Sequence, residues 1–149
     1  MQTRNILIVD DEADEAELIK RALEGLHVAD SVALVRDGEE ALAYFFGPGS
    51  DSRPLPDLVM LDLRLPKIDG IEVLAKLRAS ERTKFLPIVV FSASGDQRDF
   101  RRCYELCANS YVVKPVEYEQ LRDVVGSIAR YWLTVNQSPA SKPDLPNSL

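Results

Sequence analysis

The sequence has no apolar run long enough to cross a membrane. A transmembrane helix needs about 20 consecutive apolar residues, and the runs here are far shorter. A signal peptide is also missing, because the first apolar stretch, Ile6–Val9, is too short and runs directly into acidic residues. These absences predict a cytoplasmic protein without a membrane partner.

The chain has fewer basic than acidic residues. The chain has 18 Lys and Arg against 24 Asp and Glu, which gives a net charge of −6. Nonspecific binding to nucleic acid needs a basic surface that neutralises phosphates. The composition therefore argues against a nucleic-acid partner.

Cysteine and histidine are scarce, with two cysteines and one histidine in the chain. Cys103 and Cys107 form no C-x-x-C pair, and their spacing would put them on one face of a helix. We interpret them as small apolar residues of a helix rather than as metal or redox groups. His27 lies near the end of an expected helix, and the sequence around it does not indicate a phosphohistidine.

The residues that are present suit one globular domain: 149 in all, 46% apolar and 28% charged. Short apolar runs without polar alternation recur along the chain, as expected of strands buried on both faces of a parallel sheet. Segments with helical periodicity lie between them, and this alternation predicts a doubly wound α/β fold. The expected strands are Ile6–Val9, Val32–Val35, Leu58–Leu61, Ile88–Phe91 and Tyr111–Val113.

Two segments show no such periodicity. Residues 47–57 are rich in Gly, Pro and Ser, which predicts a surface loop. Residues 136–149 hold several prolines, and we predict a Pro/Ser-rich C-terminal tail there, after a domain that spans residues 1–135.

Reactive side chains stand where the expected strands end. Asp10 and Asp11 follow the first strand, Asp62 follows the third, Ser92 ends the fourth and Lys114 follows the fifth. Parallel α/β sheets bind ligands outside the carboxyl ends of their strands.

The clustered carboxylates predict a bound cation. Two carboxylates about 4 Å apart repel by roughly 4 kcal/mol at an effective dielectric constant of about 20, and a cation would offset this repulsion. Clustered carboxylates favour Mg²⁺, and a carboxylate can attack phosphorus to form an aspartyl-phosphate.

From Ile6 to Trp132 the sequence resembles the receiver domain of two-component response regulators. The resemblance implies a flavodoxin-like fold, in which a five-stranded parallel sheet of order 2-1-3-4-5 is covered by five helices. The motifs that carry it are VDD at 9–11, LDLRLPKIDG at 61–70, SA at 92–93 and KP at 114–115.

The resemblance also implies roles at the site. Asp62 matches the phosphoacceptor and also belongs to the metal-binding set. In that set Asp11 matches a direct metal ligand, and Asp10 an acid that holds the metal through water. The backbone carbonyl of Arg64 matches a third protein ligand. For its side chain, two possibilities stay open: it crosses the mouth of the site, or it reaches solvent or an acid such as Asp11 or Glu12.

Four further positions match the phosphoryl-sensing part of the family pattern. Lys114 matches the lysine that pairs with the phosphoryl group, and Ser92 the switch hydroxyl. Tyr111 matches an aromatic residue that moves with that hydroxyl, and Pro115 a cis proline. Other acids are interpreted as helix signals: Glu12, Asp14 and Glu15 favour the N-terminus of the first helix, and Asp69 caps the third.

The predicted function is a response regulator that accepts a phosphoryl group from a sensor histidine kinase onto Asp62 with Mg²⁺. It would not be an enzyme, and it would signal through protein contacts. The long loop at 47–57 and the segment SIARYWLTV at 127–135 resemble regulators paired with phytochrome kinases. One alternative is a receiver-like module that works without phosphate. Another is a haloacid-dehalogenase-type phosphatase, although Arg64 stands where that chemistry needs a second acid.

The last prediction concerns assembly. Tyr118, Tyr131, Trp132 and Leu133 cannot all turn inward at 3.6 residues per turn. Aromatic residues left at a rim are typical of interfaces. We expect a homodimer through the fourth helix, the fifth strand and the fifth helix.

Overall fold

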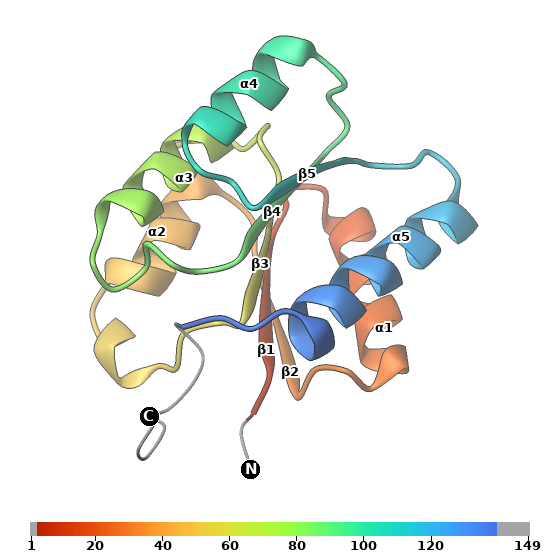
Figure 1. Ribbon diagram of the computed structural model, residues 1–149, viewed down its shortest axis with the longest axis horizontal. Coiled ribbons are helices and arrows are strands. Elements are labelled where there is room, and N and C mark those ends of the chain that lie inside the picture. Colours follow the sequence, from red (N-terminus) through yellow and green to blue (C-terminus); the bar gives the residue numbers. More distant parts are fainter. Residues whose placement is uncertain (1–2, 140–149) are drawn as a thin grey trace.

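The computed structural model describes residues 3–139, which form one parallel sheet with helices on both faces (Figure 1). The strand order is β2-β1-β3-β4-β5, so the predicted five-stranded α/β fold is confirmed. The strands are β1 (Asn5–Val9), β2 (Ser31–Val35), β3 (Leu58–Leu61), β4 (Ile88–Ser92) and β5 (Ser110–Val113). The helices are α1 (Ala13–Leu26), α2 (Gly38–Phe46), α3 (Gly70–Ala79), α4 (Gln97–Glu105) and α5 (Tyr118–Arg130), with the short turns η1 (Ser50–Ser52) and η2 (Tyr131–Val135).

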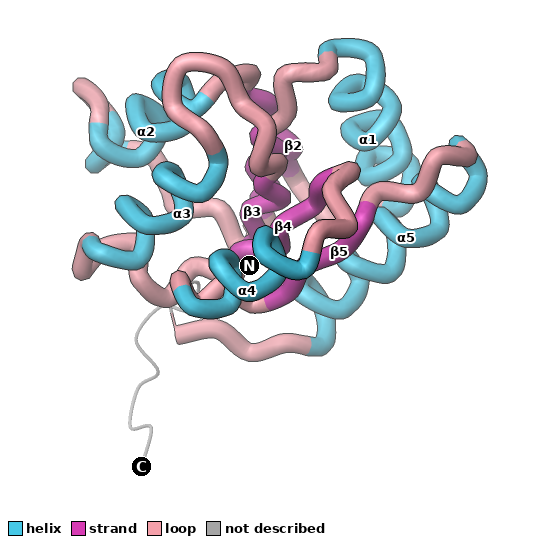
Figure 2. The backbone as a smooth tube through the Cα atoms, turned by 90° about the horizontal axis from the view of Figure 1, so that it is seen from above, coloured by secondary structure: helices cyan, strands magenta, loops and turns pink. Residues whose placement is uncertain are grey.

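Side chains of the strands alternate between two apolar layers, because successive residues of a strand point to opposite faces. In β1, Leu7 and Val9 pack against the layer that holds α2, α3 and α4, and Ile6 and Ile8 pack against α1 and α5. Figure 2 shows the two groups of helices on either side of the strands.

Burial on both faces holds for the inner strands β1, β3 and β4 but not for the outer ones. In β2 only Val35 is buried, and in β5 no residue is. The prediction was wrong for these two strands, because each has a neighbour on one side only. The exposed edge of β5 lies between α4 and α5 (Figure 1).

The loops at the carboxyl ends of the strands are held by helix caps. The side chains of Asp37, Asp69 and Asp96 accept hydrogen bonds from backbone N–H groups in the first turns of α2, α3 and α4, which confirms the cap predicted at Asp69. A side chain at Gly70 would collide with the carbonyl oxygen of Asp62. Glycine therefore lets α3 begin directly against the loop that carries Asp62.

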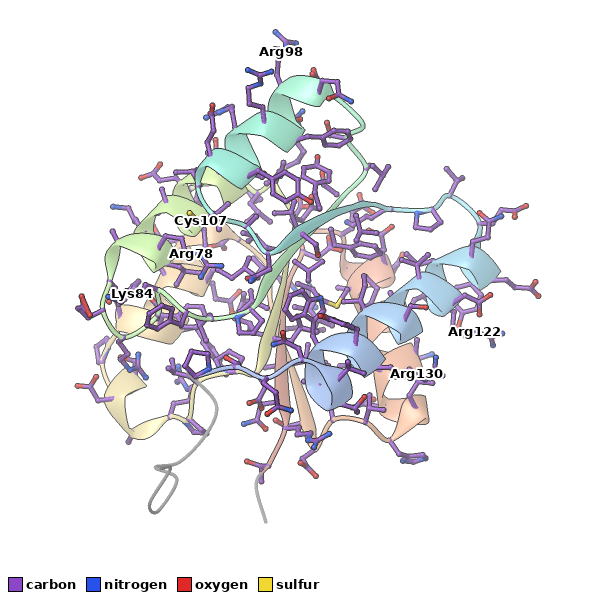
Figure 3. The ribbon with its side chains drawn as sticks, viewed as in Figure 1. Arg78, Lys84, Arg98, Cys107, Arg122 and Arg130 are labelled. Atoms are coloured by element: carbon purple, nitrogen blue, oxygen red, sulfur yellow. The ribbon has the colours of Figure 1, made fainter. Side chains whose placement is uncertain are left out.

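Two arginines hold the loops at the opposite edge of the sheet. The guanidinium of Arg78 donates to the carbonyls of Cys107, Lys84 and Leu86 and to Oδ1 of Asn109 at 2.9–3.0 Å. Figure 3 shows Arg78 beside the loops that carry Lys84 and Cys107. Arg82 binds the carbonyl of Phe45 at 2.7 Å and that of Ser50 at 2.9 Å. Both arginines connect elements far apart in the sequence.

The two cysteines differ in their surroundings. Cys103 is buried in the core beside α3, and burial raises its pKa to about 11, as expected of an inert apolar residue. Cys107 is exposed and has a left-handed backbone with φ 64° after the end of α4. The prediction of a shared helical face was therefore wrong for Cys107, because the helix ends before it.

The end of α5 also departs from expectation. The chain widens into the π-helical turn η2, in which Leu133 is buried in the core and Trp132 is partly buried, whereas Tyr131 is 48% exposed. Fewer apolar side chains therefore face solvent at the end of α5 than the sequence predicted: Leu133 is buried, and Tyr131 stays exposed. Residues 140–149, most of the predicted tail, lie outside the described residues. No helix within residues 3–139 is long and apolar enough to span a membrane.

Candidate functional site

Three carboxylates meet at the carboxyl ends of the strands, as the sequence predicted. Asp10 and Asp62 directly follow β1 and β3 and are 2% and 7% exposed, whereas Asp11 reaches solvent. One oxygen from each of the three lies within 4.8 Å of the others. A hard divalent cation fits this set, because it prefers oxygen ligands and relieves the repulsion among them.

Lys114 enters this cluster from the end of β5. Its ammonium Nζ lies 3.1 Å from Oδ2 of Asp10, 3.0 Å from Oδ2 of Asp62 and 2.7 Å from Oε1 of Glu15. Burial alone would lower the pKa of Lys114, but the hydrogen bond to Glu15 and the charges of Asp62 and Asp10 hold it above its ordinary value. The lysine is therefore a permanent cation, and one positive charge faces several negative ones.

The predicted switch residues lie beside this cluster. Ser92 is fully buried at the end of β4, and its Oγ accepts a hydrogen bond from the backbone N–H of Ser94 at 3.3 Å. The hydroxyl of Tyr111 donates to the carbonyl of Ser94 at 2.9 Å. The Tyr111 ring packs edge-on against Phe100 of α4 at 4.5 Å. Tyr111 thus contacts both the loop that follows Ser92 and the helix after it.

The family model of the response regulator receiver domain matches residues 6–126 of the chain. The chain belongs to this family. As a receiver domain it is a phosphoryl-accepting response regulator and not a classical enzyme; receiver domains act with sensor histidine kinases and use a divalent metal.

The receiver domain has relatives of similar length. It is 44% identical over 134 residues to the probable methanogenesis regulatory protein FilR2 of Methanothrix harundinacea, which covers 90% of this chain and 86% of the relative. It is 34% identical over 137 residues to the response regulator Rcp1 of Synechocystis, which covers 91% and 93%. The structure of the phosphorylated cyanobacterial phytochrome response regulator RcpA is similar with a TM-score of 0.87 at 37% identity, over 92% of this chain and 99% of that one.

One member of the receiver's charge cluster was missed by the sequence reasoning. Glu15 was interpreted as a favourable charge at the start of α1, yet its side chain binds Lys114. A signal did exist, because Glu15 stands in the first turn of α1, only four residues after Asp11 and the end of β1. The distance between positions 15 and 114 in the sequence hid the pairing.

The side chain of Arg64 reaches solvent and an acid, as one of the two open possibilities predicted: it is 73% exposed and pairs at 3.1 Å with Asp99 of α4 rather than with Asp11 or Glu12. The expectation of a cis proline was wrong, because the peptide bond before Pro115 is trans and no cis peptide bond occurs among residues 3–139. His27 lies at the C-terminal cap of α1, at the opposite edge of the sheet from the carboxylates.

Asp10 is a buried carboxyl group with a raised pKa. Burial raises its pKa from 3.8 to about 6; the charge of Lys114 and a hydrogen bond from the backbone N–H of Glu12 oppose the shift, and Asp62 adds to it. A raised pKa means that the folded protein favours protonated Asp10. Its contribution to stability is present below about pH 4 and is lost as the pH rises through about 6.

Asp10→Asn is therefore expected to stabilise the metal-free protein by about 1–3 kcal/mol at pH 7, because each pKa unit corresponds to about 1.4 kcal/mol. The gain should grow between about pH 4 and pH 6 and then level off. Urea unfolding of both proteins at several pH values, with a chelator present, measures it. A variant less stable than the wild type at pH 7 would contradict the burial argument.

Proposed function

We propose that Asp62 is the residue that accepts the phosphoryl group. Its Oδ2 contacts Lys114, its Oδ1 lies 3.4 Å from the backbone N of Arg64, and its carboxylate belongs to the acidic group with Asp10 and Asp11. Asp62 thus stands between an ammonium on one side and the metal-binding acids on the other. This position is the observation that carries the proposal.

The transfer would proceed at one Asp62 oxygen. That oxygen forms a bond to phosphorus, the phosphorus–nitrogen bond of the donor phosphohistidine breaks, and the imidazole nitrogen keeps the electron pair and takes a proton. Lys114 stabilises negative charge on the transferring group. A bound Mg²⁺ would neutralise further charge there. The residues that would hold it are Asp11, Asp62, Asp10 through water, and Arg64 through its backbone carbonyl.

The direct test is to incubate the protein with Mg²⁺ and a small acyl phosphate, and then to locate the phosphoryl group by mass spectrometry. We expect one group per chain on Asp62, with the lability to base that acyl phosphates show. Phosphate on any other residue would overturn the assignment.

Magnesium is expected to stabilise the fold, because it relieves repulsion among Asp10, Asp11 and Asp62. A ligand at about 100 times its dissociation constant adds roughly 2.7 kcal/mol. Thermal unfolding with and without millimolar Mg²⁺ measures the effect, which Asp11→Ala should remove. Asp14→Ala removes another exposed acid near the start of α1 and should leave it intact. A wild-type melting curve that ignores Mg²⁺ would refute the metal site.

We further propose that the donor is a phytochrome-type histidine kinase. The likeness to RcpA and Rcp1 supports this pairing. The name of FilR2 points to another process. The test therefore compares the rate of phosphoryl transfer to this protein from a phytochrome histidine kinase with the rate from a histidine kinase that is not a photoreceptor. Faster transfer from the phytochrome kinase is the expected result, and equal or slower transfer contradicts the pairing. The cytoplasmic location stays a prediction.

A homodimer through α4, β5 and α5 is also proposed. Exposed apolar side chains lie on these elements and on the loop between β5 and α5: Tyr104, Val113, Val116 and Tyr118. Because Leu133 is buried, the surface is tested at Val116, which is 99% exposed. Val116→Asp should shift the protein from dimer to monomer in sedimentation at micromolar concentration. Phe46→Asp changes an exposed apolar residue of α2, outside this surface, and serves as the control. A monomeric wild type, with or without a phosphoryl mimic, counts against the dimer.

A further inference from the structure

Arg64 connects the loop of the proposed phosphoacceptor to helix α4. Its backbone lies next to the Asp62 carboxylate, and its guanidinium Nη2 reaches Asp99 in the first turn of α4 at 3.1 Å. Asp99 is only 15% exposed and also accepts a hydrogen bond of 2.5 Å from the hydroxyl of Ser94. The carbonyl of Ser94 in turn binds Tyr111. A continuous set of contacts therefore runs from the Asp62 loop to β5.

The two side chains of the Arg64–Asp99 pair differ in exposure and in how firmly other contacts hold them. The Arg64 side chain is 73% exposed, and Asp99 is the one acidic partner within ion-pair distance of it among residues 3–139. Asp99 is held by α4 and by Ser94. If the pair breaks, the arginine moves and Asp99 stays with Ser94.

Phosphorylation at Asp62 would create a competitor for this arginine. The carboxylate carries one negative charge, whereas the acyl phosphate carries about two, spread over oxygens that suit a guanidinium. Arginine binds phosphate oxygens in a bidentate fork better than a single carboxylate oxygen. Arg64, which pairs with Asp99 of α4, therefore lies two residues after the site of the new charge at Asp62.

We propose that Arg64 is a latch on α4 that phosphorylation releases. In the unphosphorylated protein it holds Asp99 and, through it, the loop that carries Ser94. When Asp62 carries the phosphoryl group, the guanidinium leaves Asp99 for the phosphoryl oxygens, and the start of α4 loses its tie to the β3–α3 loop. This inference rests on the proposed role of Asp62. It assigns Arg64 and Asp99 as positioning residues that couple the site to the α4 surface.

The test uses beryllofluoride with Mg²⁺ as the phosphoryl mimic, titrated by calorimetry onto the wild type, Asp99→Asn, Arg64→Gln and the double variant. Asparagine keeps an acceptor for Ser94 but loses the charge that holds Arg64. Asp99→Asn should therefore tighten binding by about two- to five-fold, as expected of an exposed ion pair. Arg64→Gln should weaken binding. In the Arg64→Gln background, the Asp99 substitution should have no effect.

The matched control is Asp96→Asn. Asp96 pairs with Arg98 at 3.1 Å on the same helix, and Arg98 points away from the molecule (Figure 3). Breaking this pair should change the affinity much less than Asp99→Asn does, because Asp96 acts on Arg64 only through longer-range charge and asparagine caps helices as well as aspartate does. The latch is overturned if Asp99→Asn acts equally with and without Arg64, or if Asp96→Asn acts as strongly. A wild type that binds no beryllofluoride would overturn the role of Asp62 as well; normal wild-type binding with an inert Asp99→Asn would overturn the latch alone.

Discussion

Asp62→Asn is expected to abolish phosphoryl acceptance altogether. An amide oxygen is a poor nucleophile for phosphorus, and the product would lack the acyl-phosphate bond. Asparagine has almost the shape of aspartate, so the fold should survive. The substitution also removes one buried negative charge from the cluster with Asp10 and Asp11, which should not destabilise the fold. Labelling with a small acyl phosphate in the presence of Mg²⁺ gives the measurement.

Two controls separate a missing acceptor from a damaged protein. His27→Asn removes the histidine found in the described chain; asparagine tolerates the left-handed backbone of φ 56° at that position. Asp69→Asn changes a carboxylate near the site that acts as the cap of α3. Both variants should be labelled like the wild type. Labelling of Asp62→Asn at the wild-type level would mean that another residue accepts the group.

Lys114→Met is expected to cost about 3 kcal/mol of stability in the absence of a divalent metal. Methionine fills a similar volume, but the buried carboxylates of Asp10 and Asp62 and the half-buried Glu15 lose their shared cation. Removing one partner of a buried ion pair typically costs about 3–5 kcal/mol, and uptake of a proton by a carboxyl limits the loss here. Urea unfolding at pH 7 with a chelator measures it.

The cause can be tested by rescue. Adding Asp10→Asn to Lys114→Met removes one of the unpaired charges and should restore part of the lost stability, so the two effects should not add. Lys84→Met is the matched control, because Lys84 forms a more exposed pair with Glu81 and its loss should change stability by less than about 0.5 kcal/mol. Equal destabilisation by the two lysine substitutions would show that packing rather than charge accounts for the effect.

Much of the fold could be predicted from local patterns. The apolar runs marked the five strands to within a residue or so, although only β1, β3 and β4 are covered on both faces. The edge that carries Asp10, Asp62, Ser92 and Lys114 followed from topology, because parallel strands bring their carboxyl ends together. These motif residues therefore lie side by side in the structure. Which of them reacts is a matter for the labelling experiment.

Partners formed between distant elements could not be predicted in the same way. Glu15 binds Lys114 and Arg64 binds Asp99 because loops and helix starts from different parts of the chain lie within a few Å of each other. Likewise, Leu133 is buried because the π-helical turn after α5 changes the helical phase that the sequence pattern assumed. Periodicity shows which face of an element is apolar and chain order shows at which edge it ends, but the choice between neighbouring charges depends on distances that exist only once the sheet and its helices have packed.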